Sequence, residues 1–253
     1  YSKAPQPIVW MVSSVGSLLG LTYVPEQQIG AWHQHDTDGT FESCAVVAEG
    51  SEDVLYCIVR RTINGSSKRY VERMASRQFV DAEDAFFVDS GLTYSGPAVT
   101  TISGLGHLEG MTVSILADGA VRPQRVVTSG SIDLDNEGSV VHVGLPITAD
   151  LQTLPVAIAI DNGYGQGRFK NVNKAWLRVH RSSGIFIGPD SDRLTEAKQR
   201  TTEPYGSPPA LKSEEIQVML TPSWADSGQV FVRQSDPLPL TVVSMTAEVA
   251  VGG

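Results

Sequence analysis

Short runs of alternating apolar and polar residues, divided by tight-turn residues, constrain this fold more than any other feature. The first runs are rich in β-branched and aromatic residues, which is typical of strands. They cover residues 8–12, 18–23, 31–33, 41–47, 54–60 and 67–72. Gly16, Asp38-Gly39 and Asn64-Gly65 separate them, and these residue types tolerate the positive φ of two-residue hairpin loops. Residues 1–88 are therefore predicted to form an antiparallel β meander, resembling a blade at the end of a propeller.

A second unit is predicted over residues 89–154. The aromatic and acidic stretch 75–88 shows no alternation and is interpreted as a connector. Five short strands follow, at 100–102, 111–116, 125–127, 131–134 and 140–144, with a turn at Asp118-Gly119. Closure removes the edges that so small a sheet leaves open, so we expect a small β-barrel.

The third unit, residues 155–253, is predicted to be a β-sandwich with one long loop. Its strands are expected at 156–160, 174–181, 216–220, 229–233 and 240–245, and the loop at 188–211 is polar and rich in proline. Within that loop, residues 191–200 have helical character, with Asp192 placed to cap the helix. The whole chain is thus expected to be all-β.

Charge excludes a general polyanion binder. Nineteen Lys and Arg residues against 28 Asp and Glu give a net charge of -9. Basic residues do gather in two groups, which either line a surface that meets phosphates or lie on solvated strand faces paired with acids, and we favour pairing. The groups are Arg60, Arg61, Lys68, Arg69, Arg73 and Arg77, and Arg168, Lys170, Lys174, Arg178 and Arg181.

Cysteine usage and apolar runs limit the class further. Cys44 and Cys57 are too few for a disulfide scaffold and lie in alternating runs, so both are expected to be reduced and buried. No apolar stretch reaches the length of a membrane span. The sequence begins at Tyr1 directly in a strand pattern, and we expect a fragment of a longer polypeptide.

His33 and His35 are the strongest metal candidates, because residues two apart share one face of a strand. A closed site with Asp36 or Asp38 needs further ligands, and the remaining histidines lie in separate runs. We therefore expect a solvated polar cluster at a hairpin end and predict no metal or other cofactor. The remaining histidines are His107, His142 and His180.

None of the candidate catalytic motifs in the sequence has the required frame. The glycine-rich stretch 163–167 is followed by a strand-like run, whereas a phosphate loop needs a helix amino terminus. Ser129 lacks the Gly-x-Ser-x-Gly frame. Burial is expected to raise the thiol pKa values of Cys44 and Cys57 and so to lower their reactivity. Asn64-Gly65-Ser66 matches a glycosylation acceptor, but the turn interpretation is preferred. No catalytic residue is predicted, and the chain is not expected to be an enzyme.

Several short, separated sequence segments resemble segments of the tail tubular or nozzle proteins of short-tailed bacteriophages, which are also described as packaged-DNA stabilisation proteins. The resemblance covers nearly the whole chain. The segments are LLGLTY (18–23), AWHQHDTDG (31–39), VRRT (59–62), RYVERM (69–74), GLGHLEG (104–110), ADG (117–119), VGLP (143–146) and RQSDPLPL (233–240).

The resemblance implies a virion structural protein built from β domains, in which a propeller-like part is combined with smaller units. It implies a ring, commonly of six copies, that extends the tail tube, retains packaged DNA and lets it pass during ejection. Implied partners are other copies of the chain, tail proteins on the adaptor or portal side, and the distal tip or fibres. Assembly would occur in the bacterial host cytoplasm, and a prophage origin fits equally.

Two other functions compete. A carbohydrate-binding or host-surface-recognition module would use exposed tryptophans, with Trp32, Trp176 and Trp224 as candidates. A cell-wall hydrolase would need two carboxylates facing each other across a cleft. The loop at 188–211 is expected either to contact a neighbouring subunit or tail partner, or to fold over its own domain.

Overall fold

The computed structural model describes residues 1–157, 159–160, 163–165, 167–198, 203–204 and 207–252. The chain is all-β, as predicted, and its helical turns in this part are three short 3₁₀ segments: η1 (Pro25–Gln27), η2 (Ala82–Asp84) and η3 (Gly106–Leu108). None of the helices in the described residues is long and apolar enough to cross a membrane.

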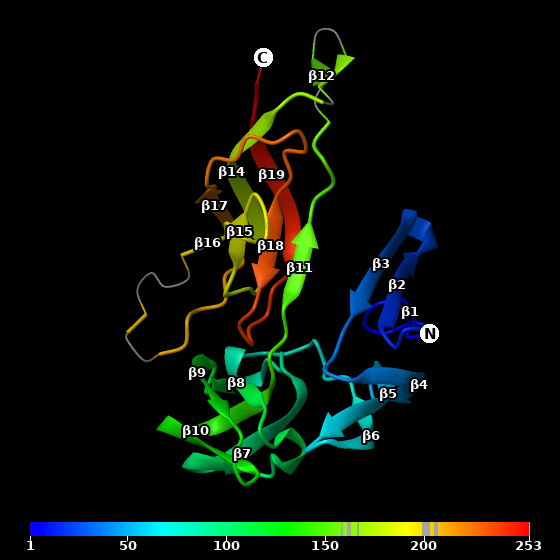
Figure 1. The fold of residues 1–253 in the computed structure, drawn as a ribbon, viewed down its shortest axis with the longest axis vertical. Helices are drawn as coiled ribbons and strands as arrows, with labels where there is room; N and C mark the ends of the chain where they lie inside the picture. Colours follow the sequence, from blue (N-terminus) through cyan, green and yellow to red (C-terminus); the bar gives the residue numbers. More distant parts are fainter. Residues whose placement is uncertain (158, 161–162, 166, 199–202, 205–206, 253) are drawn as a thin grey trace.

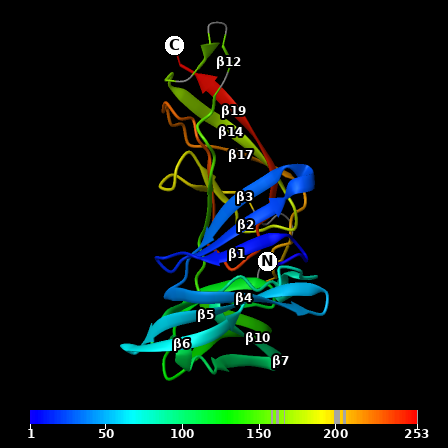
Figure 2. The ribbon, with the colours of Figure 1, turned by 90° about the vertical axis from the view of Figure 1, so that its right-hand side faces the viewer.

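The first six strands form at the predicted places but divide between two sheets. The first sheet has the order β1 (Ile8–Val12), β2 (Leu18–Val24), β3 (Ile29–His35), and the second β4 (Thr40–Glu49), β5 (Glu52–Ile63), β6 (Ser66–Arg73). Figure 2 shows β1–β3 lying over β4–β6. The prediction of one propeller-like blade is therefore wrong. The division follows from the apolar faces, because Ile8, Trp10 and Leu18 of one sheet pack on Leu55 and Val59 of the other.

The local turn chemistry in this unit is as predicted. Asn64 and Gly65 both have positive φ, 47° and 73°, as a tight hairpin loop requires. Cys44 and Cys57 lie directly opposite each other on β4 and β5, and both thiols are free. Cys57 is buried but Cys44 is only half-buried. Burial raises the pKa of the Cys57 thiol to about 12, so it is a poor nucleophile.

The second unit is an open sheet, so the predicted barrel is wrong. Its order is β7 (Asp89–Ser103), β10 (Ser131–Leu145), β8 (Thr112–Ala117), β9 (Ala120–Val126), and all neighbours are antiparallel. The two short strands expected at 131–134 and 140–144 are one long strand, β10, whose register shifts around Gly138. Leu105 and Leu108, in and beside η3, are buried in this unit's core, which therefore needs no closure of the sheet.

The third unit is a sandwich of two sheets. One has the order β11 (Ala149–Gln152), β18 (Phe231–Gln234), β15 (Phe186–Gly188), β16 (Thr195–Glu196); the other has β17 (Glu215–Met219), β14 (Lys170–Val179), β19 (Val242–Val251). Ala175, Leu177, Ile187, Val218 and Val232 fill the space between them. Strand β11 lies before the predicted boundary at residue 155, yet it pairs with β18 and belongs to this unit.

The helix predicted over 191–200 does not form in its described part, residues 191–198. Asp190 accepts the backbone N–H groups of Asp192 and Arg193, which closes a turn instead. Thr195 and Glu196 then pair with β15. Residues 199–200 lie outside the described part. Within the loop at 188–211, Ala197 is buried in the sandwich core, and Pro208 lies close to the Gly119 turn of the second unit.

The glycine-rich stretch at 163–167 adjoins strands on both sides. The hairpin β12 (Ala159–Ile160) and β13 (Gly163–Tyr164) precedes β14, which starts at Lys170. A strand follows the glycines where a phosphate loop would have a helix. Residue 166 of this stretch lies outside the described residues.

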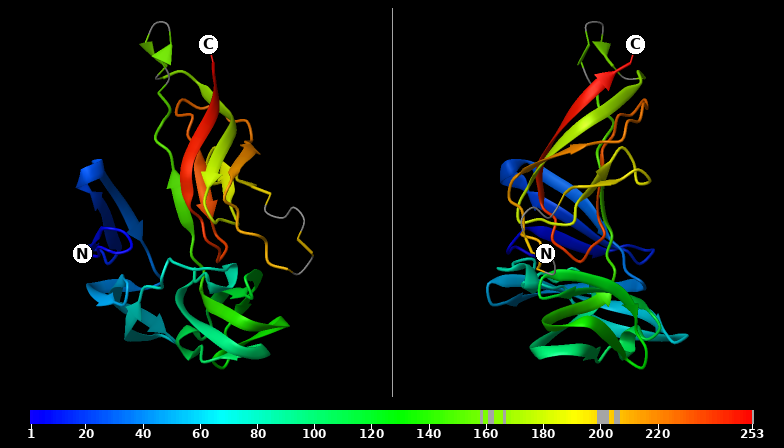
Figure 3. Two further views of the ribbon diagram at one scale, coloured as in Figure 1. Left: turned by 180° about the vertical axis from the view of Figure 1, so that it is seen from behind. Right: turned by 90° about the vertical axis from the view of Figure 1, so that its left-hand side faces the viewer.

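The two sheets of the first unit lie beside the other two units. In Figures 1 and 3 the sandwich and the β1–β3 sheet stand side by side above the β7–β10 sheet, with β4–β6 next to the latter. The connector between β6 and β7 lies among all of them. Its Ala85 packs with Leu116 of β8 and with Leu238, which follows β18, so one small apolar cluster joins the connector, the second unit and the sandwich.

Candidate functional site

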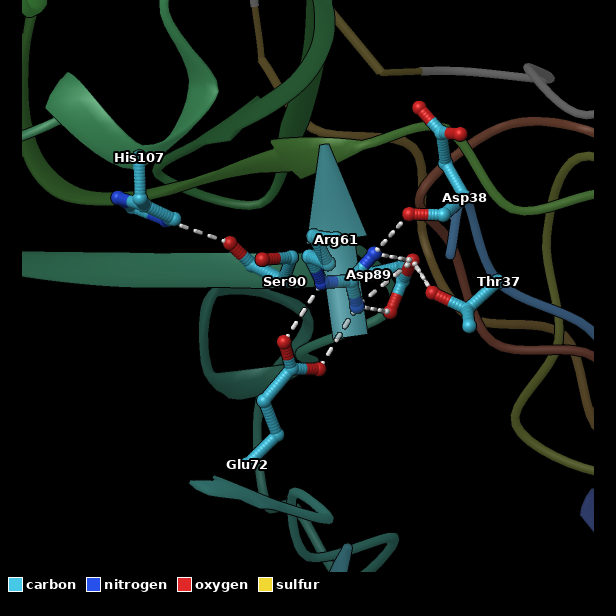
Figure 4. A network of polar contacts seen from close by, with 7 residues as sticks. All are labelled: Thr37, Asp38, Arg61, Glu72, Asp89, Ser90 and His107. Atoms are coloured by element: carbon cyan, nitrogen blue, oxygen red, sulfur yellow. Dashed lines mark hydrogen bonds and ion pairs between the residues drawn. The ribbon is translucent and has the colours of Figure 1, made fainter. Parts of the chain in front are cut away.

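Arg61 lies at the junction of the first two units, and only 2% of its side chain is exposed. Its Nε and Nη2 groups donate to the two carboxylate oxygens of Glu72 at 2.6 and 2.7 Å. Nη1 donates to the Asp38 carbonyl at 2.8 Å, and Asp89 accepts from Nη2 at 3.2 Å and from Nη1 at 3.4 Å (Figure 4). All five N–H donors of the guanidinium are thus engaged.

The local sequence explains why an arginine reaches this place. Residues two apart on a strand share a face, and Leu55, Cys57 and Val59 of β5 face the core. Arg61 continues that series, whereas Arg60 points the other way and is half-exposed. The guanidinium therefore enters the interior at the end of the strand, where carboxylates must meet it.

Those carboxylates come from different elements. Glu72 lies on β6 and Asp89 begins β7, so one guanidinium bridges the first unit and the second. Thr37, in the turn before β4, donates its hydroxyl to Asp89 at 2.6 Å. Gly39 lets this turn approach β5, because a Cβ there would lie 2.6 Å from the Arg60 carbonyl. The junction thus joins β5, β6, β7 and the β3–β4 turn.

His107 extends the junction into the second unit. Its Nε2 is 2.8 Å from the Ser90 carbonyl, next to Asp89, and its ring lies 6.4 Å from that of Tyr70 on β6. Ser90 has a positive φ of 48°, which is uncommon for a residue with a side chain. We call Thr37, Asp38, Arg61, Glu72, Asp89, Ser90 and His107 the junction network.

Electrostatics keep Arg61 charged at the centre of this network. Burial alone would lower the pKa of Arg61, but the hydrogen bonds and charges of Glu72 and Asp89 outweigh it and raise the pKa above its ordinary value. A guanidinium held in this state neither gives up nor takes a proton near neutral pH. The arrangement links the first unit to the second through ion pairs and hydrogen bonds to one side chain.

The other basic residues of the first group are mostly paired, as the favoured interpretation predicts. Glu42 bridges Arg60 at 3.2 Å and Arg69 at 2.6 Å, and Glu49 pairs with Arg73 at 2.8 Å. In the second group, Lys174 pairs with Glu248, and Lys170 is buried with its Nζ on two backbone carbonyls. These side chains do not form a row of free cations.

The histidine pair is less solvated than predicted. His33 Nδ1 lies 2.8 Å from His35 Nε2, and both rings lie within 5.6 Å of the buried Trp10 ring. Burial, with the charges of His33 and Arg77, lowers the pKa of His35 to about 4. Within the described residues, no group of three or more His, Cys, Asp or Glu side chains is placed to hold a metal ion.

The tryptophans proposed for glycan stacking lie apart. Trp32, on β3, is 63% exposed, and Trp224, in the loop beside the start of β14, is 55% exposed. Trp176 is half-buried in the middle of β14. Trp32 lies in the first unit and the other two lie in different elements of the third, and no ring contact joins any two of them in the described part of the chain.

Sequence reasoning grouped Arg61 with surface cations and missed the junction network. The sequence did indicate that Arg61 points inward, because it continues the two-residue spacing of the buried residues Leu55, Cys57 and Val59. Comparison with known proteins adds no assignment, since no family model and no curated protein matches the chain.

Proposed function

We propose that this chain is a structural component of a bacteriophage or prophage tail. In this role it forms part of a tail-tube or nozzle ring through which DNA is retained and ejected. The supporting observation is that residues from several of the resembling sequence segments lie together in the folded chain. Asp38, Arg61, Glu72 and His107 come from four separate segments, and all four belong to the junction network.

A wall around a DNA channel must keep its shape under load. Buried ion pairs with full hydrogen bonding hold one geometry, because any displacement leaves a charge unpaired. Arg61 places such pairs between β6 and β7, and the Ala85, Leu116 and Leu238 cluster adds an apolar contact to the sandwich. Stiff coupling of this kind suits a wall segment.

Charge also suits passage of DNA. A basic lumen would retain DNA through counterion release, whereas an acidic surface lets it slide. The net charge is -9, and the arginines of β5 and β6 are neutralised by Glu42, Glu49 and Glu72. In this proposal the partners are other copies, commonly six in a ring, and tail proteins on the portal side and at the tip.

The test is the mass of the full-length protein in solution. Sedimentation or native mass spectrometry should find a closed oligomer, with six copies the expected number. A monomer that persists at high protein concentration would refute the ring.

A further inference from the structure

A hollow of about 610 Å³ lies between the connector and the ends of the sandwich strands. Arg77, Gln78 and Phe79 of the connector form one wall, and His180, Arg181 and Thr241 form the other. Hollows of this size are typical of sites for small molecules. The junction network contributes no residue to it.

Arg181 is held in place at this hollow. It follows β14 with a positive φ of 47°, and its backbone N–H donates to the Ser213 hydroxyl at 2.9 Å. Its guanidinium lies over the Phe79 ring at 4.7 Å, and its Nη2 donates to the Val80 carbonyl. One side of the fork is thereby fixed, and its other N–H groups have no acceptor in the described residues.

Arg77 faces the same hollow without a counter-ion. In contrast to Arg60, Arg61, Arg69 and Arg73, it has no ion pair or hydrogen-bond acceptor in the described part of the chain. Its side chain is exposed at the edge of the hollow, so the guanidinium can meet an anion that enters from solvent. An anion placed beside such an unpaired cation is attracted to it.

The remaining polar groups complete the site. Asp84 is the acid at its edge, and its carboxylate accepts the Asp81 backbone N–H at 3.3 Å, turned toward its own 3₁₀ segment. The Gln78 amide and the Thr241 hydroxyl make no hydrogen bond of their own in the described residues. They remain free to bind hydroxyl groups.

We propose that this hollow binds an anionic monosaccharide, with its phosphate or carboxylate group between Arg77 and Arg181. Guanidinium forks match both oxyanions. Gln78, His180 and Thr241 line the space where sugar hydroxyls would lie. The site shares no residue with the junction network.

Calorimetric titration of the whole chain at low salt tests the site, with glucose 6-phosphate, galacturonate, glucose and inorganic phosphate as probes. Both anionic sugars should bind saturably, and glucose should not. Arg77→Gln and Arg181→Gln should each weaken binding about tenfold, the effect of losing one charged hydrogen bond. Arg178→Gln, at an exposed position of β14, should leave binding unchanged.

Failure of both anionic sugars to bind would overturn the proposal. So would equal binding of inorganic phosphate and glucose 6-phosphate, because the sugar would then contribute nothing. Equal losses in Arg178→Gln and Arg77→Gln would show unspecific charge attraction. Since Arg77 has no described protein partner, Arg77→Gln keeps the test valid even if Arg181→Gln disturbs the fold.

Discussion

Arg61 engages three other elements through a single side chain, so replacing it measures how much the junction contributes to stability. Arg61→Met removes the donors but leaves Glu72, Asp89 and the Asp38 carbonyl in place. Unpaired charges of this kind cost about 3 kcal/mol. We expect the free energy of unfolding, measured by urea titration, to fall by about that amount.

Two further variants serve as comparisons for Arg61→Met. Arg61→Lys should rescue little, because an ammonium group lacks the planar fork that meets two carboxylates. Arg69→Gln removes an exposed pair with Glu42 and should have no measurable effect. If Arg61→Met were as mild as Arg69→Gln, the junction network would not stabilise the chain.

Three histidines make the free energy of unfolding depend on pH. Burial lowers the pKa values of His33, His35 and His142, that of His35 to about 4. The unfolded chain takes up these protons near pH 6.5 and the folded chain only at lower pH. Stability is therefore complete above about pH 6.5 and is lost as the pH falls toward 4.

The urea midpoint, measured between pH 7.5 and 4, should show this loss. His35→Gln should make the profile shallower than that of the unaltered chain. Carboxylates such as Asp150, whose pKa Arg233 lowers, act only at still lower pH. A profile of unchanged steepness in His35→Gln would contradict the account.

At the scale of elements, β10 passes very close to the start of β7. A Cβ on Gly144 would lie 2.6 Å from the Asp89 carbonyl and 2.7 Å from the Gly91 Cα, and backbone atoms cannot move aside. Gly144→Ala should therefore destabilise the chain by about 1–3 kcal/mol. Gly106→Ala meets nothing within 4 Å and should be neutral. Equal melting temperatures for the two variants would show that a methyl group fits at Gly144 without a clash.

The sequence was sufficient for individual strands and turns because these depend on local chemistry. Asn64-Gly65 and Asp118-Gly119 adopt positive φ as their residue types predict. The grouping of strands was not predictable in this way. Whether β3 and β4 share a sheet depends on which apolar faces meet, and Trp10 and Leu55 are distant in sequence.

The same limit applies to sites. Parity along β5 points Arg61 inward, but its partners Glu72 and Asp89 are set by packing between units. Arg77 and Arg181 are about a hundred residues apart in sequence, and they line the same hollow only because the connector packs beside the sandwich. The helix expected at 191–200 does not form in its described part because Thr195 and Glu196 pair with β15 and Ala197 is buried in the sandwich core, contacts that local propensity does not reveal.

On the scale of the whole molecule, neutralised arginines predict weak attraction to DNA. Fluorescence anisotropy should find little binding of the chain to duplex DNA at physiological salt. Glu42→Gln frees Arg60 and Arg69 together, so binding at low salt should increase. Glu109→Gln removes an acid that caps backbone N–H groups and should change binding less. Tight, salt-sensitive binding by the unaltered chain would argue against sliding.

We propose that these β units are a wall segment of a tail ring, and electron microscopy of the protein is the decisive experiment. Electron-microscopic class averages should show a closed ring around a hole wide enough for duplex DNA, with the units seen here in its wall. Particles with no central opening, or an opening too narrow for a duplex, would contradict the account.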